Sequence, residues 1–342
     1  MIKALLAILI MSFATPAIAQ KQDSVLTEAQ AWQDLQSQLQ VERRSYLILW
    51  PGNDEGLLAL EKHLSQYPDS PHRCEVLYMQ AIGLWNLYRY KEAAEAYDRF
   101  IKACPDEQLA ILAMTRHVQS LVRSDQPDRA IELYARYRAK PAVDQRTPAF
   151  LDAMLLQGKV ADVRLILEEM IKASDSGVAP SRSIDMLESK LRQLEMVGKP
   201  LPGFEVQALN GNSSISPESF RGQILLIEFW ASWCKPCVSQ MHFLTRAYDE
   251  FHHQGFEILG VNLDEELAIV EPVMGQLGMK WPQFADGLKW GNKLAVQFEV
   301  RRIPYSMLVD RQGIVRYVNV PPAAVARLVE ELLGSAEEMT SP

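Results

Sequence analysis

The chain has 342 residues, of which 48% are hydrophobic and 23% are charged, a composition typical of folded globular proteins. This length predicts about two domains, each large enough to bury a core of its own. The formal net charge of −8 argues against a nucleic-acid-binding protein, because phosphate binding requires a basic face. After the N-terminal segment, no stretch approaches the roughly 18 apolar residues that a membrane span requires.

Residues 1–19 have the pattern of a secretory signal peptide. Lys3 precedes an apolar run over 4–11, and the small residues Ala17 and Ala19 match a cleavage site after Ala19. A retained anchor helix is the alternative, and the lack of a cysteine at the cleavage point argues against a lipid anchor. We therefore expect an exported protein of the periplasm or cell envelope, without a membrane span after cleavage.

Residues 20–172 are predicted to form a domain of helical hairpins. Ala93 and Ala130 are small residues 37 positions apart, each followed four positions later by an aromatic residue, so that two helices can approach closely. The segment resembles tetratricopeptide repeats, and an irregular helical domain is the alternative. The copies of the repeat are 57–60, 93–97, 130–134 and 163–167.

The pattern changes after the helical half. Residues 173–183 are small and polar with Pro and Gly, which indicates a connector, and an amphipathic helix over 184–196 completes a linker over 173–197. Residues 198–336 then alternate between strands and helices, an α/β order, and 337–342 form a tail. The expected strands are 224–230, 256–262, 305–310 and 314–319, and the expected helices are 235–252, 265–277 and 322–333.

Four cysteines divide into two kinds of pair. Cys234 and Cys237 are separated by two residues and indicate a redox pair, whereas Cys74 and Cys104 are isolated. In the helical-hairpin interpretation Cys74 begins one helix and Cys104 ends its antiparallel partner, so these two ends are neighbours. We expect a structural disulfide between them in an oxidising compartment, with two buried free thiols as the alternative.

The segment 228–237 carries the chemistry. An apolar strand ends at Trp230, and after a turn Cys234 stands at the start of a helix, where unpaired N–H groups and the helix dipole favour a thiolate. Pro236 suits the first helical turn. Cys237 lies one turn further, within reach of a mixed disulfide formed at Cys234. We therefore expect one exposed nucleophile and one sheltered resolving thiol, as thiol exchange requires.

Several motifs in the second half occur together and in a recognisable order. They are Pro200–Phe204, Asn210–Gly211, Phe220–Gly222, Trp233–Cys237, Gly260–Asp264, Arg302–Pro304 and Asp310–Gly313. With these motifs, the segment from about 198 to 335, some 40% of the chain, resembles the thioredoxin superfamily and specifically its exported TlpA/ResA-like branch. The resemblance implies a thioredoxin fold, with a central mixed sheet flanked by helices.

The resemblance also implies roles for residues around the cysteines. Pro304 is expected to be a cis-proline beside the sulfur atoms, presenting the backbone of Ile303 to an extended substrate. Glu228 occupies the place of a buried acid, whose raised pKa suits it to take the proton of Cys237. A carboxylate solvated at a strand edge is the alternative for Glu228. Expected substrate contacts are Trp233, Lys235, Pro236, Ile303 and Tyr305.

Two departures from the family pattern lie near the expected docking surface. Residues 238–242 lack the Glu and Pro that often follow the second cysteine, and Tyr305 replaces the usual Thr after the cis-proline. Substrate preference therefore does not follow from the resemblance. Lys235 adds a positive charge beside Cys234, which favours the thiolate and makes the disulfide more oxidising.

We interpret the protein as an envelope thiol–disulfide oxidoreductase, most simply a protein disulfide reductase. Its partners are client thiols and disulfides and a membrane electron donor, and it needs no cofactor or metal beyond the Cys234–Cys237 pair. A zinc site lacks two further ligands, and a peroxidase lacks its usual Pro-x-x-x-Thr-x-x-Cys segment. A non-catalytic scaffold that binds partners through the helical half is the remaining alternative.

Overall fold

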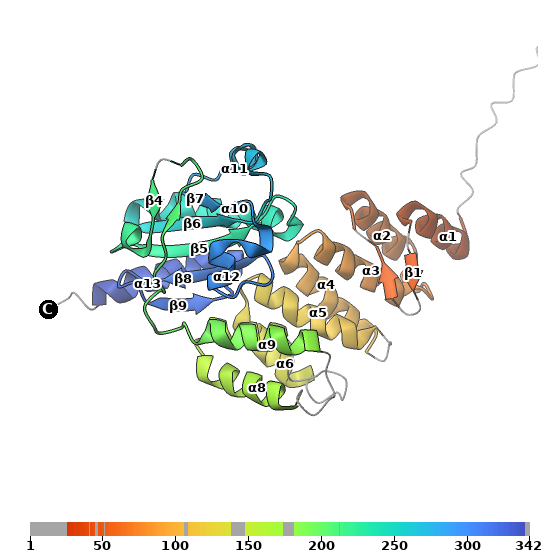
Figure 1. Cartoon of the computed structure of the whole chain (residues 1–342). Coiled ribbons are helices and arrows are strands. Elements are labelled where there is room, and N and C mark those ends of the chain that lie inside the picture. Colours follow the sequence, from red (N-terminus) through yellow and green to blue (C-terminus); the bar gives the residue numbers. More distant parts are fainter. Residues whose placement is uncertain are drawn as a thin grey trace, which may run out of the picture.

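The structure is a computed structural model that describes residues 26–40, 42–44, 47–50, 52–105, 109–137, 148–173, 181–211 and 213–338. A helical array leads into an α/β domain, with α1 and α2 far from that domain (Figure 1). The expected signal peptide lies outside the described residues. Within them, no helix has the length and apolar character needed to cross a bilayer. The array consists of α1 Glu28–Leu39, α2 Asp54–Gln66, α3 Arg73–Asn86, α4 Tyr90–Ala103, α5 Ala110–Arg123, α6 Pro127–Tyr137, α7 Pro148–Leu156, α8 Val160–Ala173 and α9 Ser181–Leu194.

Three helical hairpins, α3–α4, α5–α6 and α7–α8, share one turn geometry. Tyr88, Asp125 and Gly158 each adopt a positive φ, of 60°, 55° and 71°. The next residue then donates its N–H to the carbonyl five positions earlier, a bond that ends a helix. The first half is therefore helical, as expected, and these hairpins repeat a common unit. The three bonds join Arg89 to Leu84, Gln126 to Leu121 and Lys159 to Met154, at 2.8–3.0 Å.

A disulfide closes the open end of the first of these hairpins. Cys74 lies in the first turn of α3 and Cys104 follows the last residue of α4, with Cα atoms 5.9 Å apart. The ring of Tyr78 on α3 packs edge-on against Tyr97 and Phe100 on α4, with centroids 6.4 and 5.4 Å apart. The bond thus joins two helix ends, 30 positions apart in the sequence, whose packing already brings them together.

The structure departs from the expected order of helices and strands mainly in its short elements. The first half, expected to contain little strand, holds an antiparallel pair, β1 Glu42–Arg44 and β2 Leu47–Leu49. Strands this short do not show the two-residue alternation on which a prediction depends. The expected connector over 173–183 is also reduced, since α8 extends to Ala173 and α9 begins at Ser181. Other elements that the sequence analysis missed are β3 Val206–Gln207, β4 Ser214–Ile215, β7 Gln283–Ala285 and α12 Lys293–Gln297.

The second half has a thioredoxin fold around a five-stranded mixed sheet in the order β7-β6-β5-β8-β9. The central strand β5, Ile224–Trp230, runs parallel to β6, Phe256–Asn262, and antiparallel to β8, Tyr305–Val309. All seven residues of β5 are buried, as its continuous apolar run predicts for a strand covered on both faces. At the edges, β7 pairs parallel with β6, and β9, Val315–Val318, pairs antiparallel with β8.

Helices cover this sheet. The long helix α10, Lys235–Phe251, follows β5 after a turn of four residues and lies beside α13, Val325–Glu338 (Figure 1). A shorter helix α11, Val270–Leu277, follows β6. The ring of Phe298, just after α12, packs edge-on against Phe229 of β5, with centroids 6.3 Å apart. The end of β5 and the start of α10 are therefore held by packing along both elements.

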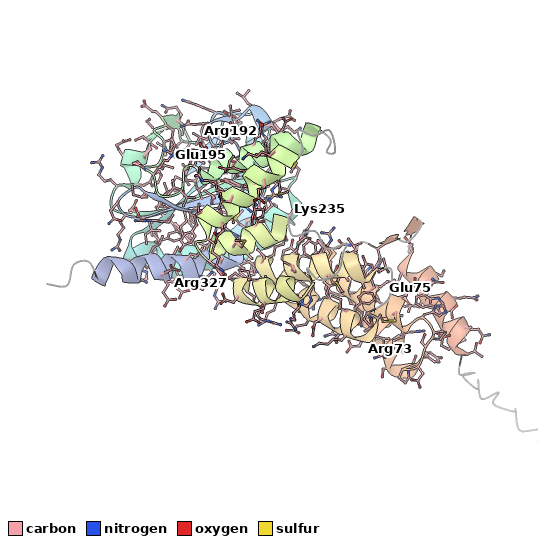
Figure 2. The ribbon with its side chains drawn as sticks, turned by 90° about the horizontal axis from the view of Figure 1, so that it is seen from below. Arg73, Glu75, Arg192, Glu195, Lys235 and Arg327 are labelled. Carbon is pink, nitrogen blue, oxygen red and sulfur yellow. A yellow bond between two sulfur atoms is a disulfide. The ribbon has the colours of Figure 1, made fainter. Side chains whose placement is uncertain are left out.

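Polar contacts fix the array to the α/β domain. Arg327 of α13 donates two hydrogen bonds, of 2.8 and 2.6 Å, to Asp125 in the α5–α6 turn. Ser189 and Gln193 of α9 donate to the backbone carbonyl of Glu299, at 2.7 and 2.8 Å. Figure 2 shows Arg327 and Lys235 near this junction, with Arg73 and Glu75 toward the other end of the array. Gln240 of α10 lines one cavity together with Arg116 and Arg123 of α5, so this side of α10 lies toward the array.

The disulfide generates the first prediction. Replacing both Cys74 and Cys104 by Ala should lower the free energy of unfolding of the array by about 3.6 kcal/mol, because the unfolded chain regains the freedom of a closed loop of about 30 residues. Urea unfolding followed by circular dichroism measures this. The reduced wild-type protein should unfold at the same urea concentration as the variant. Equal stability of the variant and the oxidised wild type would contradict the prediction.

Candidate active site

The cysteine pair lies at the N-terminus of α10. Cys234 is the N-cap residue, and its Sγ accepts a hydrogen bond of 3.3 Å from the backbone N–H of Cys237. Pro236 stands in the first turn, where a missing N–H leaves no bond unmade. The two cysteines are joined, with Cα atoms 5.3 Å apart. This geometry provides an N–H donor to the sulfur on which negative charge would develop when the bond is reduced.

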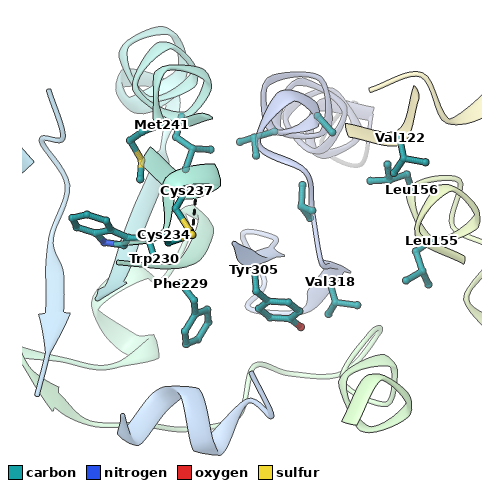
Figure 3. Close-up of a cluster of buried hydrophobic side chains, with 14 of the residues drawn as sticks. Val122, Leu155, Leu156, Phe229, Trp230, Cys234, Cys237, Met241, Tyr305 and Val318 are labelled. Carbon is teal, nitrogen blue, oxygen red and sulfur yellow. Dashed lines mark hydrogen bonds between the residues drawn. A yellow bond between two sulfur atoms is a disulfide. The ribbon is translucent and has the colours of Figure 1, made fainter. Parts of the chain in front are cut away.

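Both sulfur-bearing residues are sheltered in the disulfide form. Cys234 is 4% exposed and Cys237 is 2% exposed, so the expected contrast between an open nucleophile and a buried partner is absent in this state. Figure 3 shows the pair between Met241 of α10 and Trp230 at the end of β5, with Val122 of the array across from them. The sequence could not predict this shelter, because it depends on how segments far apart in the chain pack around the pair.

The turn between β5 and α10 is held by a carboxylate that the sequence analysis did not single out. Asp264 accepts hydrogen bonds from the backbone N–H and the hydroxyl of Ser232, at 2.9 and 2.7 Å. Asn262 donates a third bond to the same carboxylate, at 2.7 Å. The only sequence signal was the motif over Gly260–Asp264, which marked the family and not this contact. Asp264 is therefore a positioning residue for the turn that carries the cysteines.

A second buried contact fixes the last residue of β5. The indole N–H of Trp230 donates to Oε1 of Gln283 on β7, at 2.9 Å. Gln283 fits because Gly260 lies between them on β6, and a Cβ atom at Gly260 would stand 2.0 Å from that same oxygen. The glycine of the motif over Gly260–Asp264 thus makes room for a side chain that orients Trp230.

The Ile303–Pro304 peptide bond is cis, and it precedes β8 directly. Among the described residues, the backbone N–H and carbonyl of Ile303 have no hydrogen-bond partner. Both residues are half-buried and line a cavity with Gln240 of α10. An extended polypeptide could pair with this free backbone as an added strand does.

Glu228 is buried in β5, with 1% exposure, and lies opposite Ser306 of β8. Burial raises the pKa of Glu228 well above the usual carboxyl value, and a hydrogen bond with Ser306 lowers it by less. The hydroxyl of Ser306 also donates to the carbonyl of Val320, at 2.9 Å, which competes for its single hydrogen. Glu228 therefore holds a proton at pH values where an exposed carboxyl would have lost it, and the alternative of a solvated carboxylate is wrong.

The remaining residues expected at the docking surface divide into two groups. Trp233 and Lys235 are exposed beside the pair, and Pro236 is half-buried. The expectation that Tyr305 contacts the substrate is wrong. Its side chain is 3% exposed, and its ring centroid lies 5.9 Å from that of Phe229 inside the domain. Its position as the first residue of β8 turns the side chain into the core, so it is not placed to contact a substrate.

Another exposed aromatic residue extends the surface around Trp233. Trp290 lies in a short 3₁₀ segment, Lys289–Gly291, and its ring meets that of Trp233 edge-on with centroids 6.0 Å apart. Leu288 beside it is also exposed. No motif marks Trp290 in the sequence.

Among the described residues, no three His, Cys, Asp or Glu side chains gather as a metal site.

Comparison with known proteins gives consistent matches. Residues 196–332 match the Redoxin family. The chain is 32% identical over 119 residues to the thiol-disulfide oxidoreductase ResA of Bacillus thuringiensis (strain Al Hakam), covering 35% of this chain and spanning 66% of that protein's length. It is also 32% identical over 127 residues to ResA of Bacillus cereus (strain ATCC 10987 / NRS 248). This match covers 37% of this chain and 70% of that protein's length. The crystal structure of the thioredoxin domain of a thiol-disulfide oxidoreductase from Bacteroides vulgatus is 24% identical, with a TM-score of 0.37, and the match covers 40% of this chain and 97% of that one.

The burial of Glu228 generates the second prediction. A carboxyl whose pKa is raised on folding binds more protons in the folded than in the unfolded chain, so its contribution to stability falls as pH rises above about 4.3. The slope reaches about 1.4 kcal/mol per pH unit until the folded group ionises. Glu228→Gln removes this slope, so the variant should gain stability relative to the wild type between pH 5 and 8.

Urea unfolding of the oxidised proteins at several pH values checks this. Glu250→Gln, which changes an exposed carboxyl on α10, is the matched control and should follow the wild type. A constant difference between Glu228→Gln and the wild type across this range would show that the carboxyl is not kept protonated by the fold.

Proposed function

Because this chain belongs to the family of thiol-disulfide oxidoreductases that includes ResA, we propose that it is an exported enzyme that reduces disulfides of client proteins in the cell envelope. The single observation that carries the proposal is the hydrogen bond from the N–H of Cys237 to Sγ of Cys234 at the N-terminus of α10. It favours the thiolate form of Cys234, and the thiolate is the reactive species in disulfide exchange.

The first step is attack by the Cys234 thiolate on one sulfur of a client disulfide. A new S–S bond forms between Cys234 and the client, the client's own S–S bond breaks, and the second client sulfur leaves as a thiolate. The exposed ring of Trp233 and the free backbone of Ile303 are available to hold the client segment during this step. In this step the sulfur of Cys234 is oxidised by one electron equivalent and the departing client sulfur is reduced by one.

In the second step Cys237 attacks Sγ of Cys234 and releases the first client sulfur as a thiolate. The two electrons then reside on the client, and the enzyme carries the Cys234–Cys237 disulfide found in the structure. Cys237 must lose a proton before it attacks. We assign the acceptance of this proton to the ionised form of Glu228, which burial makes less populated but more basic than an exposed carboxylate.

The oxidised enzyme needs a donor of two electrons, and we assign this role to a membrane protein. The signal-peptide pattern of residues 1–19 supports export, as does the Cys74–Cys104 disulfide, because an oxidising compartment favours structural disulfides. The helical hairpins, which we compare to tetratricopeptide repeats, would then dock partners, since arrays of this kind present extended surfaces.

Separate variants of the two cysteines test the assignment. Cys234→Ser should abolish reduction of insulin disulfides, because the attacking thiolate is lost. Cys237→Ser should still attack but fail to resolve, so it should accumulate a mixed disulfide visible on a non-reducing gel and by intact mass. The double variant with Ala at 74 and 104 should keep wild-type activity. Trapping by Cys234→Ser and not by Cys237→Ser would reverse the roles.

Glu228→Gln tests the proton transfer. The variant should form the mixed disulfide at the wild-type rate and resolve it about 10²-fold or more slowly, since general base catalysis contributes on that order. Quenched-flow trapping with acid separates the two steps. Glu250→Gln should behave as the wild type, and unchanged resolution in Glu228→Gln from pH 6 to 9 would remove this residue from the mechanism.

A further inference from the structure

A polar cavity lies where the helical array meets the cis-proline segment. Its volume is about 190 Å³, enough for several water molecules. Trp85, Arg116 and Arg123 line it from the array, and Ile303 and Pro304 line it from the α/β domain. Figure 3 views this region, with Val122 of α5 on one side and the Cys234–Cys237 pair on the other. The cavity therefore adjoins the segment where a client backbone would dock.

The two arginines of α5 are held in place by aromatic rings. The Cζ atom of Arg116 stands 4.6 Å from the ring centroid of Trp85, and that of Arg123 stands 5.6 Å from the same centroid. Arg123 also lies 5.2 Å from the centroid of Tyr90. Cation–π contacts of this kind orient a guanidinium without neutralising it.

No carboxylate among the described residues forms an ion pair with Arg116 or Arg123. Arg116 has a hydrogen bond of 3.2 Å to the amide oxygen of Gln119, which carries no charge. Both arginines are half-buried, so water screens their charges less than it would at an open surface. Two neighbouring cations in such a place attract an anion strongly.

Among the described residues, the carboxylate that lines the cavity is that of Asp152, and it is already paired. Asp152 of α7 forms an ion pair with Lys190 of α9 and lies 3.9 Å from Arg302, which also lines the cavity. Its charge is therefore matched by cations other than those of α5. The cavity keeps an excess of positive charge beside the cis-proline.

A buried polar atom also lacks a partner at this cavity. The side-chain amide of Gln240 is almost fully buried and donates through Nε2 to the carbonyl of Pro236, at 3.1 Å. Its Oε1 has no hydrogen-bond partner in the part of the chain that the structure describes. A buried acceptor without a partner is costly, and a backbone N–H of a bound polypeptide would satisfy it. Together with the free backbone of Ile303, it favours a peptide ligand over a free anion.

We propose that this arginine pocket, formed by Arg116, Arg123 and Trp85, binds a carboxylate of the client polypeptide close to the disulfide that is reduced. The inference rests on the proposed function and adds a preference for acidic client segments, supplied by the helical array. Arginine suits this task, since its planar fork of N–H donors matches the two oxygens of a carboxylate. The array thereby acts as part of the substrate site.

The experiment uses short peptides that carry one cysteine as a mixed disulfide with 2-thiopyridine, whose release is followed by absorbance. Each peptide is acetylated and amidated, and one Glu is moved through the three positions on either side of the cysteine, with Gln as its neutral partner. The reduced wild-type protein should react about tenfold faster with Glu than with Gln at one or more positions, as a charge-assisted hydrogen bond provides. The advantage should shrink as salt is raised.

A further peptide places a free C-terminal carboxylate at the preferred position in place of Glu, which distinguishes a side-chain from a terminal carboxylate. In the variant with both Arg116→Gln and Arg123→Gln, the ratio of Glu to Gln rates should fall to about one. Because this ratio is internal to each protein, loss of overall activity does not affect it. Arg73→Gln, at the distant end of the array, is the matched control and should keep the wild-type ratio.

The outcomes separate the two proposals. Equal Glu and Gln rates for the wild type at every position would overturn the arginine pocket and leave the reductase function standing, as would an unchanged ratio in the double variant. A wild-type protein that reacts with none of the peptides, and does not reduce insulin, would overturn the proposed function and this inference with it.

Discussion

The junction of β5 with α10 is the constraint on which the rest of this structure depends. A strand buried along its whole length ends at Trp230, and four residues later Cys234 caps a helix of 17 residues. The position of the sulfur is therefore fixed by the sheet on one side and by the helix on the other. The N–H of Cys237 points at that sulfur because helix geometry leaves the first amides without intrahelical acceptors.

The neighbouring elements serve the same junction. Asp264, two residues after β6, binds the turn at Ser232, and Gln283 of β7 binds the indole of Trp230. Both contacts come from strands on one side of β5, whereas Ile303 and Pro304 precede β8 on its other side. The active-site turn is thus held from one flank by side chains and faces a free backbone on the other flank.

The helical array changes what this site presents to a client. It is attached through Asp125 and Arg327 at one point and through Glu299 and helix α9 at another. Those attachments bring α5 next to the cis-proline segment, so that Arg116 and Arg123 face the same cavity as Ile303. A thioredoxin fold without the array would lack these cations, because they come from a different half of the chain.

Local patterns in the sequence were sufficient for several features. The apolar run of β5, the cysteine spacing with Pro236 and the helical periodicity of the first half depend on neighbours within a few residues, so strand, helix start and redox pair could be predicted directly. The cis bond at Pro304 and the buried acid at Glu228 followed only from resemblance to a family. Contacts between distant segments decided the rest: Asp264 and Gln283 gained their roles from sheet order, Tyr305 was turned into the core by its place in β8, and Arg116 came to the site through domain packing. Such contacts join residues far apart in sequence, and no local pattern records which surfaces will meet when the chain folds.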